Sequence, residues 1–196
     1  MKWEILDRKL VYRGFFQLEV LQLKHRLYDG GWSPVLQREL FRRSDGVAVL
    51  PYDPLRDDVL LIEQFRTGAI ESQPNPWLVE IVAGLVEPGE HREAVAHREA
   101  CEETGCELLD LLHVMDYYSS PGGFGERVSL YIARADFSGV TGVYGVREEG
   151  EDIRVSRVSA EAAFEMVASN VIVSATPIIA IQWLQINHKR IRELWA

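Results

Sequence analysis

Apolar and polar residues alternate near the start of the chain, which is the pattern of a half-buried β-strand. Phe16, Leu18 and Val20 alternate with polar neighbours, so their side chains share one face. Residues 29–31 (Asp-Gly-Gly) are a strong turn signal, after which the chain returns as a partner strand. A sheet of about three strands buries little surface by itself. We therefore expect residues 1–43 to form a small N-terminal antiparallel β-sheet domain that packs on another subunit or on the main domain.

Continuous apolar runs replace this alternation after Asp45, as expected for strands that are buried on both faces. Strands are predicted, in chain order, at residues 47–50, 59–62, 77–83, 107–115, 127–134 and 153–158. Helices are predicted at residues 90–104, after an N-cap at Ser159, and from an N-cap at Thr176 to about Trp195. Strands mixed with three helices predict an α/β/α sandwich with a mixed sheet in residues 44–196, with the first helix on one side and the other two opposite.

Composition narrows the class of protein. Of the 196 residues, 47% are hydrophobic and 26% are charged, as in ordinary soluble globular proteins. No apolar run reaches the length of about 18 residues that a membrane span needs, and the N-terminus lacks the apolar segment of a secretory signal. The net charge of −9 disfavours non-specific binding to nucleic acid. The two cysteines, Cys101 and Cys106, make no disulfide framework, so a cytoplasmic location is expected.

Residues 84–106 combine a Gly-Pro loop with an acidic helix. Glu99, Glu102 and Glu103 are spaced i, i+3, i+4, so they share one helix face. One interpretation of these carboxylates alone is a solvated acidic surface. The other is a site for Mg²⁺, which prefers oxygen ligands and is held by one or two carboxylates together with substrate phosphates. His97 and Cys101 are also one helical turn apart, but two ligands are too few for a zinc site.

The whole stretch resembles the Nudix box, Gly-x5-Glu-x7-Arg-Glu-U-x-Glu-Glu-x-Gly-U, in which U is an apolar residue. The nine fixed positions are occupied here by Gly84, Glu90, Arg98, Glu99, Ala100, Glu102, Glu103, Gly105 and Cys106. Ala100 and Cys106 are small residues for the apolar positions. The resemblance implies a loop–helix–loop that binds a divalent metal and hydrolyses a nucleoside diphosphate linked to another group. The Nudix fold it implies agrees with the predicted sandwich.

The resemblance extends over nearly the whole chain and favours the ADP-ribose pyrophosphatase branch of the family. Pro121 lies sixteen residues after Gly105, within a Ser-Pro-Gly-Gly segment that resembles the mark of this branch. Further similar segments are residues 12–16, 61–64, 76–78, 151–155 and 181–185. The branch forms homodimers that exchange the N-terminal sheet, which agrees with the need of residues 1–43 for a partner.

The resemblance also implies roles for individual acidic residues. The metal ligands would be Glu99, Glu103, Glu151 and the main-chain carbonyl of Ala83. Glu102 would ligate or support the metal ions, and Glu149 would be the general base that deprotonates the attacking water. Glu102 and Glu149 are therefore the expected catalytic carboxylates. A solvated acidic loop is the other interpretation of the region around Glu149, with Glu148 and Glu151 as rival bases.

Four further residues would bind the substrate by the same resemblance. Phe15 and Arg38 would sandwich the adenine, with one or both supplied by the second subunit. Arg66 would contact the diphosphate, and Glu126 the terminal ribose. The alternatives are core packing for Phe15, surface positions for the two arginines, and an ion pair of Glu126 with the neighbouring Arg127.

These residues together predict Mg²⁺-dependent hydrolysis of the diphosphate bond of ADP-ribose to AMP and ribose 5-phosphate, with Mn²⁺ as a substitute metal. Two other functions remain open at this stage. One is hydrolysis of another nucleoside diphosphate sugar such as GDP-mannose. The other is a non-catalytic regulator that binds ADP-ribose, against which the intact set of glutamates argues. The expected partners are a small nucleoside diphosphate sugar and a second copy of the chain, with no nucleic acid and no membrane.

Overall fold

The computed structural model describes residues 2–72 and 74–195, apart from the side chain of Glu149. It contains two compact units. The first comprises Met1–Asp45 and Tyr118–Arg127, and the second comprises Gly46–Tyr117 and Val128–Ala196. The segment between Tyr118 and Arg127 thus belongs with the N-terminal sheet, a grouping that the sequence pattern did not suggest.

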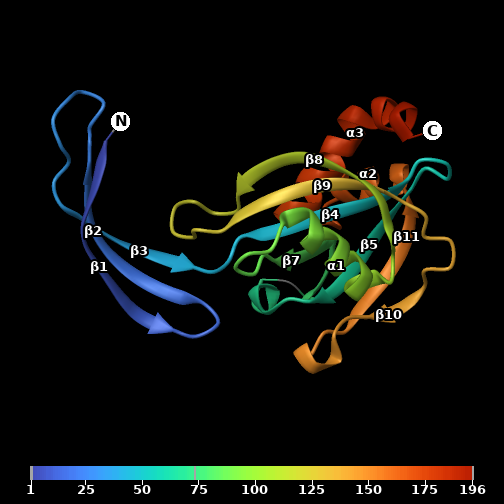
Figure 1. Ribbon diagram of the computed structural model, residues 1–196, viewed down its shortest axis with the longest axis horizontal. Helices are drawn as coiled ribbons and strands as arrows, with labels where there is room; N and C mark the ends of the chain where they lie inside the picture. The colour runs from blue at the N-terminus through green and yellow to red at the C-terminus, as the bar shows by residue number, and fades with distance from the viewer. Residues whose placement is uncertain (1, 73, 196) are drawn as a thin grey trace. The chain divides into compact units, whose positions relative to one another are not determined.

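The first unit is a three-stranded antiparallel sheet, as predicted (Figure 1). Its strands are β1 (Trp3–Arg13), β2 (Gln17–His25) and β3 (Leu36–Arg42). The turn at Gly30 and Gly31 needs glycine because both residues have positive φ, 98° and 77°. Segment 118–127 lies beside β3, where Phe41 N donates to the carbonyl of Gly123 (2.8 Å) and Gly125 N donates to that of Phe41 (3.0 Å).

The second unit is built on an eight-stranded mixed sheet. Its strands are β4 (Gly46–Asp53), β5 (Asp58–Phe65), β6 (Trp77–Glu80), β7 (Val82–Leu85), β8 (Leu108–Tyr118), β9 (Arg127–Ala135), β10 (Gly142–Tyr144) and β11 (Ile153–Ser159). The order is β10-β11-β5-β4-β9-β8, and β4 runs parallel to β9. β4 and β5 share only two residue pairs, beyond which β6 pairs with β5 and β7 pairs with β4.

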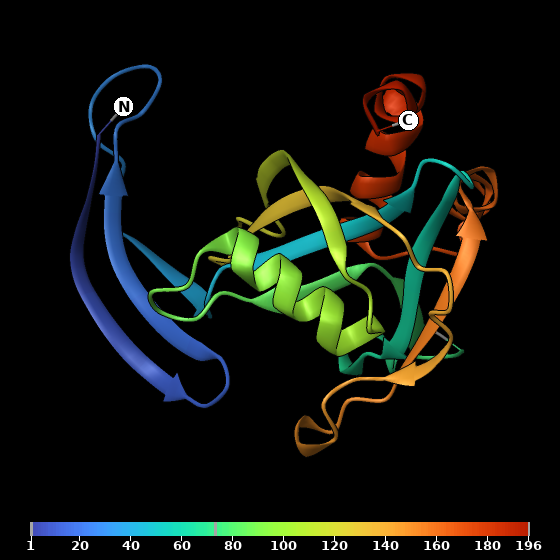
Figure 2. The same cartoon turned by 45° about the vertical axis from the view of Figure 1, so that its right-hand side comes forward.

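Helices cover both faces of this sheet, which confirms the predicted α/β/α sandwich (Figure 2). The helices are α1 (Arg92–Thr104), α2 (Ala160–Ala168) and α3 (Ala175–Trp195). Along β4, Val47 and Val49 pack on the side of α1, whereas Ala48 and Leu50 pack on the side of α2 and α3. Burial on both faces explains why this strand is a continuous apolar run.

The helix ends differ in part from the sequence predictions. Ser159 is the N-cap of α2, as predicted, and its hydroxyl accepts a hydrogen bond from Ala162 N (3.2 Å). The N-cap predicted at Thr176 is wrong because α3 begins at Ala175; the Thr176 hydroxyl instead accepts a hydrogen bond from Tyr117 (2.6 Å). Over the described residues, no helix has the length and apolar composition needed to cross a membrane.

Asp57 ties the turn between β4 and β5 to helix α3. Its Oδ1 accepts a hydrogen bond from Tyr52 (2.7 Å) and lies 2.6 Å from His188 Nε2, and its Oδ2 lies 3.5 Å from Arg192 Nη1. Burial raises the pKa of this carboxyl, but these partners outweigh it and lower the pKa below its ordinary value of 3.8. The backbone of Asp57 has φ of 59°, a left-handed conformation that Asp and Asn tolerate.

We expect Asp57→Asn to lower the free energy of unfolding by about 2 kcal/mol, because it removes the charge but keeps a side chain that fits the backbone. Since the folded-state pKa is lowered, the stabilisation is present above the ordinary carboxyl pKa and is lost as pH falls through the folded-state value. Urea unfolding should therefore separate variant and wild type at neutral pH and bring them together in acid. Asp136→Asn is the control: the pKa of Asp136 is also lowered, mainly by the hydrogen bond from Ser138 N (2.9 Å), but the amide oxygen of Asn can still accept that bond, and the ion pair with Arg56 is exposed (58%). Equal stability at neutral pH would contradict the prediction.

Candidate active site

The candidate site forms where helix α1 packs on strand β7. Glu103, near the C-terminal end of α1, is 2% exposed and accepts a hydrogen bond from Ala83 N (3.0 Å). Glu99 lies one turn earlier, directly over Gly84: a Cβ at Gly84 would lie 1.8 Å from Glu99 Oε1. Gly84 is therefore required by the close approach of this carboxylate. The spacing of the box thus brings Glu99, Glu103 and the backbone of Ala83 together.

The buried carboxylates repel one another. Burial raises the pKa of Glu103 to about 8; the hydrogen bond from Ala83 opposes the rise, while the charges of Glu99 and Glu151 increase it. Burial also raises the pKa of Glu99, which Arg98 only partly offsets. Two carboxyls with raised pKa values that face a third acid form a site that is short of positive charge.

Arg98 supplies part of that charge. Its Nη1 donates to Glu99 Oε1 (2.8 Å) and to Glu102 Oε2 (3.1 Å), and its Nε lies 3.6 Å from Glu90 Oε1. Burial lowers the pKa of the Arg98 guanidinium, but the surrounding carboxylates raise it above its ordinary value. The Glu102 side chain is 37% exposed, so the acidic face runs from the buried Glu103 to solvent.

A divalent metal ion fits these donors. Carboxylate and carbonyl oxygens are the ligands that Mg²⁺ and Mn²⁺ prefer. A cation would offset the burial that chiefly raises the pKa of Glu103, and also the smaller effect of the neighbouring carboxylates. In the described part of the chain, no three acidic, His or Cys side chains already converge as a metal cage. Glu99 and Glu103, beside the backbone of Ala83, are the groups that would hold such an ion.

Helix α1 is shorter than predicted at its N-terminal end. It begins at Arg92 instead of residue 90, because the Glu90 carboxylate accepts a hydrogen bond from Glu87 N (2.9 Å) and belongs to the loop. The predicted C-terminal end is confirmed: Gly105 has φ of 66° and caps the helix.

The loop after β9 contacts the C-terminal end of α1. Gly145 N donates to the carbonyl of Glu102 (3.2 Å), and the ring of Tyr144 lies against Gly105, where a Cβ would be 2.7 Å from the ring. Glu151 accepts a hydrogen bond from Val146 N (3.0 Å) and faces Glu99 and Glu103 closely enough to raise their pKa values. The loop thus brings one expected metal ligand towards the helix.

The side chain of Glu149, the expected general base, lies outside the described part of the structure. Its backbone belongs to the short 3-10 helix η2 (Arg147–Glu149). Gly150 follows with φ of 74° and ends this turn two residues after Glu148. The expected base is therefore on the same loop as Glu151, next to the segment that contacts α1.

Arg66 lies at the end of β5 and forms an ion pair with Glu80 of β6. Its Nε and Nη2 both donate to Glu80 Oε2, at 2.8 Å and 2.6 Å. Sequence reasoning missed Glu80, although one acid in the apolar run at residues 77–83 was a signal that it has a partner. The charge of Arg66 also reaches Glu103: burial raises the pKa of Glu103, and Arg66 is among the groups that lower it.

The first unit carries Phe15 and Arg38, the two residues expected to sandwich adenine. Phe15 is 73% exposed in the turn between β1 and β2. Arg38 is paired with Leu21 across the sheet, whereas Arg42 is paired with Gln17 next to that turn. Arg38 is therefore four residues farther along β3, or about 13 Å at the rise of a strand.

Glu126 is buried and paired within the same unit. It is 5% exposed and accepts hydrogen bonds from Arg43 Nε (2.7 Å) and Ser119 Oγ (3.0 Å), with Arg43 Nη2 also in contact. Arg43 was not among the expected site residues. Its guanidinium also stacks near the rings of Phe16 and Phe124, at 5.9 Å and 5.6 Å from their centroids.

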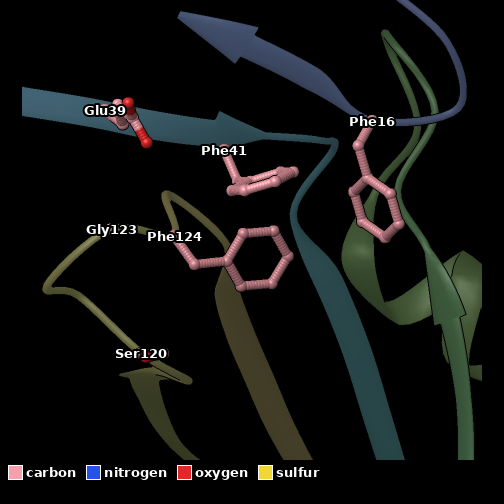
Figure 3. Close-up of a pocket in the computed structure, with 6 residues that line it drawn as sticks. All are labelled: Phe16, Glu39, Phe41, Ser120, Gly123 and Phe124. Atoms are coloured by element: carbon pink, nitrogen blue, oxygen red, sulfur yellow. The ribbon is translucent and has the colours of Figure 1, made fainter. Parts of the chain in front are cut away.

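An open cavity of about 530 Å³ lies beside these aromatic residues (Figure 3). Its lining is Phe16, Glu39, Phe41, Ser120, Gly123 and Phe124. Figure 3 shows the ring of Phe41 facing that of Phe124, with Phe16 beside them. The ring of Phe16 is edge-on to both, at centroid distances of 6.2 Å and 6.1 Å. The cavity is therefore lined mainly by aromatic rings, with Glu39 and Ser120 as its polar side chains.

We expect Gly84→Ala to lower kcat/KM for nucleoside diphosphate sugar hydrolysis by about 30-fold. A methyl group at Gly84 would occupy the place of the Glu99 carboxylate and displace it, and a displacement of about 1 Å at a reacting site can cost up to 10²-fold. Gly68→Ala is the matched control, because a Cβ there meets no atom within 4 Å. Steady-state kinetics would measure both variants, and an unchanged Gly84→Ala enzyme would show that Glu99 does not need its position over Gly84.

Comparisons with known proteins show which family the chain belongs to. The sequence model of the NUDIX domain matches residues 42–174. The chain belongs to the Nudix family. The resemblance seen in the sequence is therefore confirmed, and the matched range includes the whole box together with the loop that carries Glu149 and Glu151.

Several Nudix relatives are similar over almost their full length. The chain is 43% identical to the ADP-ribose pyrophosphatase of Escherichia coli K12 (98% of this chain and 92% of the relative). It is 42% identical to that of Haemophilus influenzae (98% and 90%). The GDP-mannose pyrophosphatase of Cronobacter sakazakii is 32% identical (94% and 95%). A crystal structure of an ADP compounds hydrolase superposes with a TM-score of 0.69 at 22% identity, over 94% of this chain and 95% of that one, which supports the fold.

Proposed function

We propose that the protein is an ADP-ribose pyrophosphatase, which hydrolyses the diphosphate bond of ADP-ribose to AMP and ribose 5-phosphate. The observation that carries the proposal is the Nudix box placed on α1 with Glu99 and Glu103 against β7, in a chain 43% identical to a named ADP-ribose pyrophosphatase over 98% of its length. The GDP-mannose pyrophosphatases among the relatives are less similar, with 32% sequence identity to this chain.

The residues of the site would have different roles in this reaction. The metal would be held by Glu99, Glu103, Glu151 and the Ala83 carbonyl, with Glu102 ligating or supporting it at the exposed edge. When bound, Mg²⁺, or Mn²⁺ in its place, supplies charge neutralisation on the phosphate oxygens and a lowered pKa of bound water. Arg66 would bind a diphosphate oxygen through the N–H groups that Glu80 leaves available.

Glu149 would accept the proton of the attacking water, since a carboxylate on a loop beside the metal ligands can come within hydrogen-bond reach of that water. Glu148 and Glu151 are the rival bases. Glu151 already accepts a hydrogen bond from Val146 N and lies near the carboxylates of Glu99 and Glu103, which supports its proposed role as a metal ligand that they share.

We also propose that the active form is a homodimer with residues 1–43 as its dimerisation domain and residues 44–196 as its hydrolase domain. The sheet of the first unit leaves large apolar side chains exposed on β1: Trp3, Ile5, Leu6, Leu10, Val11 and Tyr12. A monomer seldom exposes so many adjacent apolar side chains. Phe15 and Arg38 are separated along the strand within one chain, so a sandwich around adenine would need one of them from the second copy.

Sedimentation equilibrium tests the dimer. The expected mass is about twice the 22.3 kDa of one chain, and a monomer at micromolar concentration would refute it. For the compartment, we propose the cytoplasm, because Cys101 and Cys106 are both free thiols. Neither a nucleic acid nor a membrane is proposed as a partner, given the net charge of −9.

Product analysis tests the proposed reaction. The protein is incubated with Mg²⁺ and, separately, with ADP-ribose, GDP-mannose, ADP-glucose and NADH. We expect AMP and ribose 5-phosphate to form fastest from ADP-ribose. Faster turnover of GDP-mannose would show that the protein is a hydrolase whose preferred substrate is not ADP-ribose. Binding of ADP-ribose without turnover of any compound would indicate a regulator and refute the enzyme.

A further inference from the structure

The ion pair of Arg66 and Glu80 has a feature that a surface ion pair lacks. Glu80 is only 8% exposed, while the Arg66 side chain is 41% exposed. A buried carboxylate is costly without a partner, so Glu80 needs the guanidinium. The guanidinium itself reaches the surface, where it is available to a ligand. The buried Glu80 carboxylate therefore fixes the position of the exposed Arg66 guanidinium.

The hydrogen bonds determine which edge of the guanidinium stays available. Glu80 Oε2 accepts hydrogen bonds from Arg66 Nε (2.8 Å) and Nη2 (2.6 Å). These bonds use two of the five N–H groups of the guanidinium. The backbone is also held, because Arg66 N donates to the carbonyl of Pro76 (2.9 Å). Arg66 is thus held at its backbone and along one edge of its guanidinium, with three N–H groups left over.

Strand pairing shows which face of the sheet this arrangement lies on. Glu80 is directly opposite Ile62 in the β5–β6 ladder, so their side chains share a face. Ile62 belongs to the core cluster that contains Val95 and Ala96 of α1. Glu80 therefore lies on the α1 face, together with Glu103, on whose pKa the charge of Arg66 acts after the larger effect of burial.

We propose that Glu80 is a positioning residue, which holds the Arg66 guanidinium ready to bind the diphosphate of the substrate beside the carboxylates of α1. The inference rests on the proposed function, since it assigns the diphosphate to Arg66. A free arginine side chain loses rotamer entropy when it is immobilised. An arginine that is already held loses less on binding, which favours the complex.

Electrostatics alone predicts the opposite sign. Glu80 is a negative charge near the place proposed for a doubly charged diphosphate, so its removal should strengthen binding if only charge mattered. Loss of positioning should weaken binding. The direction of the change in KM therefore separates the two accounts.

The experiment compares Glu80→Met and Glu80→Gln with wild type in steady-state hydrolysis of ADP-ribose. Met has a similar length but no acceptor, whereas Gln keeps one acceptor oxygen for Arg66. We expect KM to rise about tenfold in Glu80→Met and by less in Glu80→Gln, with kcat within about twofold of wild type. An unchanged or lower KM in both variants would overturn the inference.

A second substitution separates positioning from general destabilisation. In an Arg66→Ala background, Glu80→Met should raise KM no further, because Glu80 acts through Arg66. The same rise in both backgrounds would overturn the inference. Asp53→Asn is the matched control: it weakens another buried carboxylate, 2% exposed, that pairs with a half-exposed arginine, Arg56 (2.6 Å), and should leave KM unchanged.

Binding of inorganic pyrophosphate with Mg²⁺, measured by calorimetry, keeps this test independent of the substrate. If wild type fails to hydrolyse ADP-ribose, the proposed function is wrong. The weaker pyrophosphate binding expected for Glu80→Met, about tenfold, would still support the positioning role. Equal pyrophosphate affinity in wild type and both Glu80 variants would refute it. Thermal unfolding of each variant confirms that the folded protein is being measured.

Discussion

Glu99→Gln should lower kcat for ADP-ribose hydrolysis by about 10³-fold at saturating Mg²⁺. The Glu99 carboxylate occupies space that only a glycine at position 84 leaves free. Gln has nearly the same shape as Glu but lacks the negative charge that holds a cation. A metal that neutralises phosphate oxygens is worth several kcal/mol, and about 4 kcal/mol corresponds to this factor. Two quantities are measured: the single-turnover rate, and the affinity for Mn²⁺, which is determined by electron paramagnetic resonance.

Glu93→Gln is the control for this variant. Glu93 is in the first turn of the same helix and carries the same charge, but it lies outside the box spacing. We expect its rate and its Mn²⁺ affinity to stay within about twofold of wild type, as is usual for substitutions away from a site. Wild-type turnover by Glu99→Gln would show that the metal ligands are elsewhere.

Glu149→Gln should lower kcat by about 10³-fold while leaving the affinity for ADP-ribose nearly unchanged. A general base contributes about 10²- to 10⁴-fold, because proton transfer from the attacking water occurs only in the transition state. An amide cannot accept that proton. The loss should also be smallest at high pH, where hydroxide replaces the base. Kinetics at several pH values, with calorimetric binding of the non-hydrolysable α,β-methylene analogue, would measure both effects.

Glu148→Gln provides the comparison on the same short helix η2. If Glu149 is the base, Glu148→Gln should change kcat by no more than about threefold, since exposed charges contribute little. A large loss in Glu148→Gln with a small one in Glu149→Gln would transfer the role to Glu148. Loss of substrate affinity in Glu149→Gln, with kcat unchanged, would indicate a binding role instead.

Much of the fold could be predicted because its signals are local. Strands such as β4 are buried on both faces, so each is an uninterrupted apolar run, and Gly105 ends α1 through its own backbone preference. Strand β1 was not located from the sequence. Its pairing with β2 shifts register between Ile5 and Asp7 and again between Leu10 and Tyr12, so the simple alternation of a strand is broken.

The candidate site, like the fold, could be predicted from the sequence only in part. The spacing of Glu99 and Glu103 within one helix was visible in the sequence, and so was Gly84 at the start of the box. The partners of Arg66 and Glu126 were not visible. Glu80 lies fourteen residues from Arg66, and Arg43 lies 83 residues from Glu126, so these contacts depend on which strands and loops become neighbours. Periodicity carries no information about such pairings.

The contact between Tyr144 and Gly105 couples the end of helix α1 to the segment that leads into the turn carrying Glu149. Any side chain at Gly105 would have to displace the Tyr144 ring, in addition to the strain of the positive φ at this cap position. Conversely, a small residue in place of Tyr144 at the end of β10 would leave this glycine less covered. A substitution at either position is therefore expected to shift the loop that carries Glu149 relative to α1, while the spacing of Glu99 and Glu103 on the helix stays the same. The effects of substitutions at Gly105 and at Tyr144 should therefore not be additive, because the two residues are in direct contact.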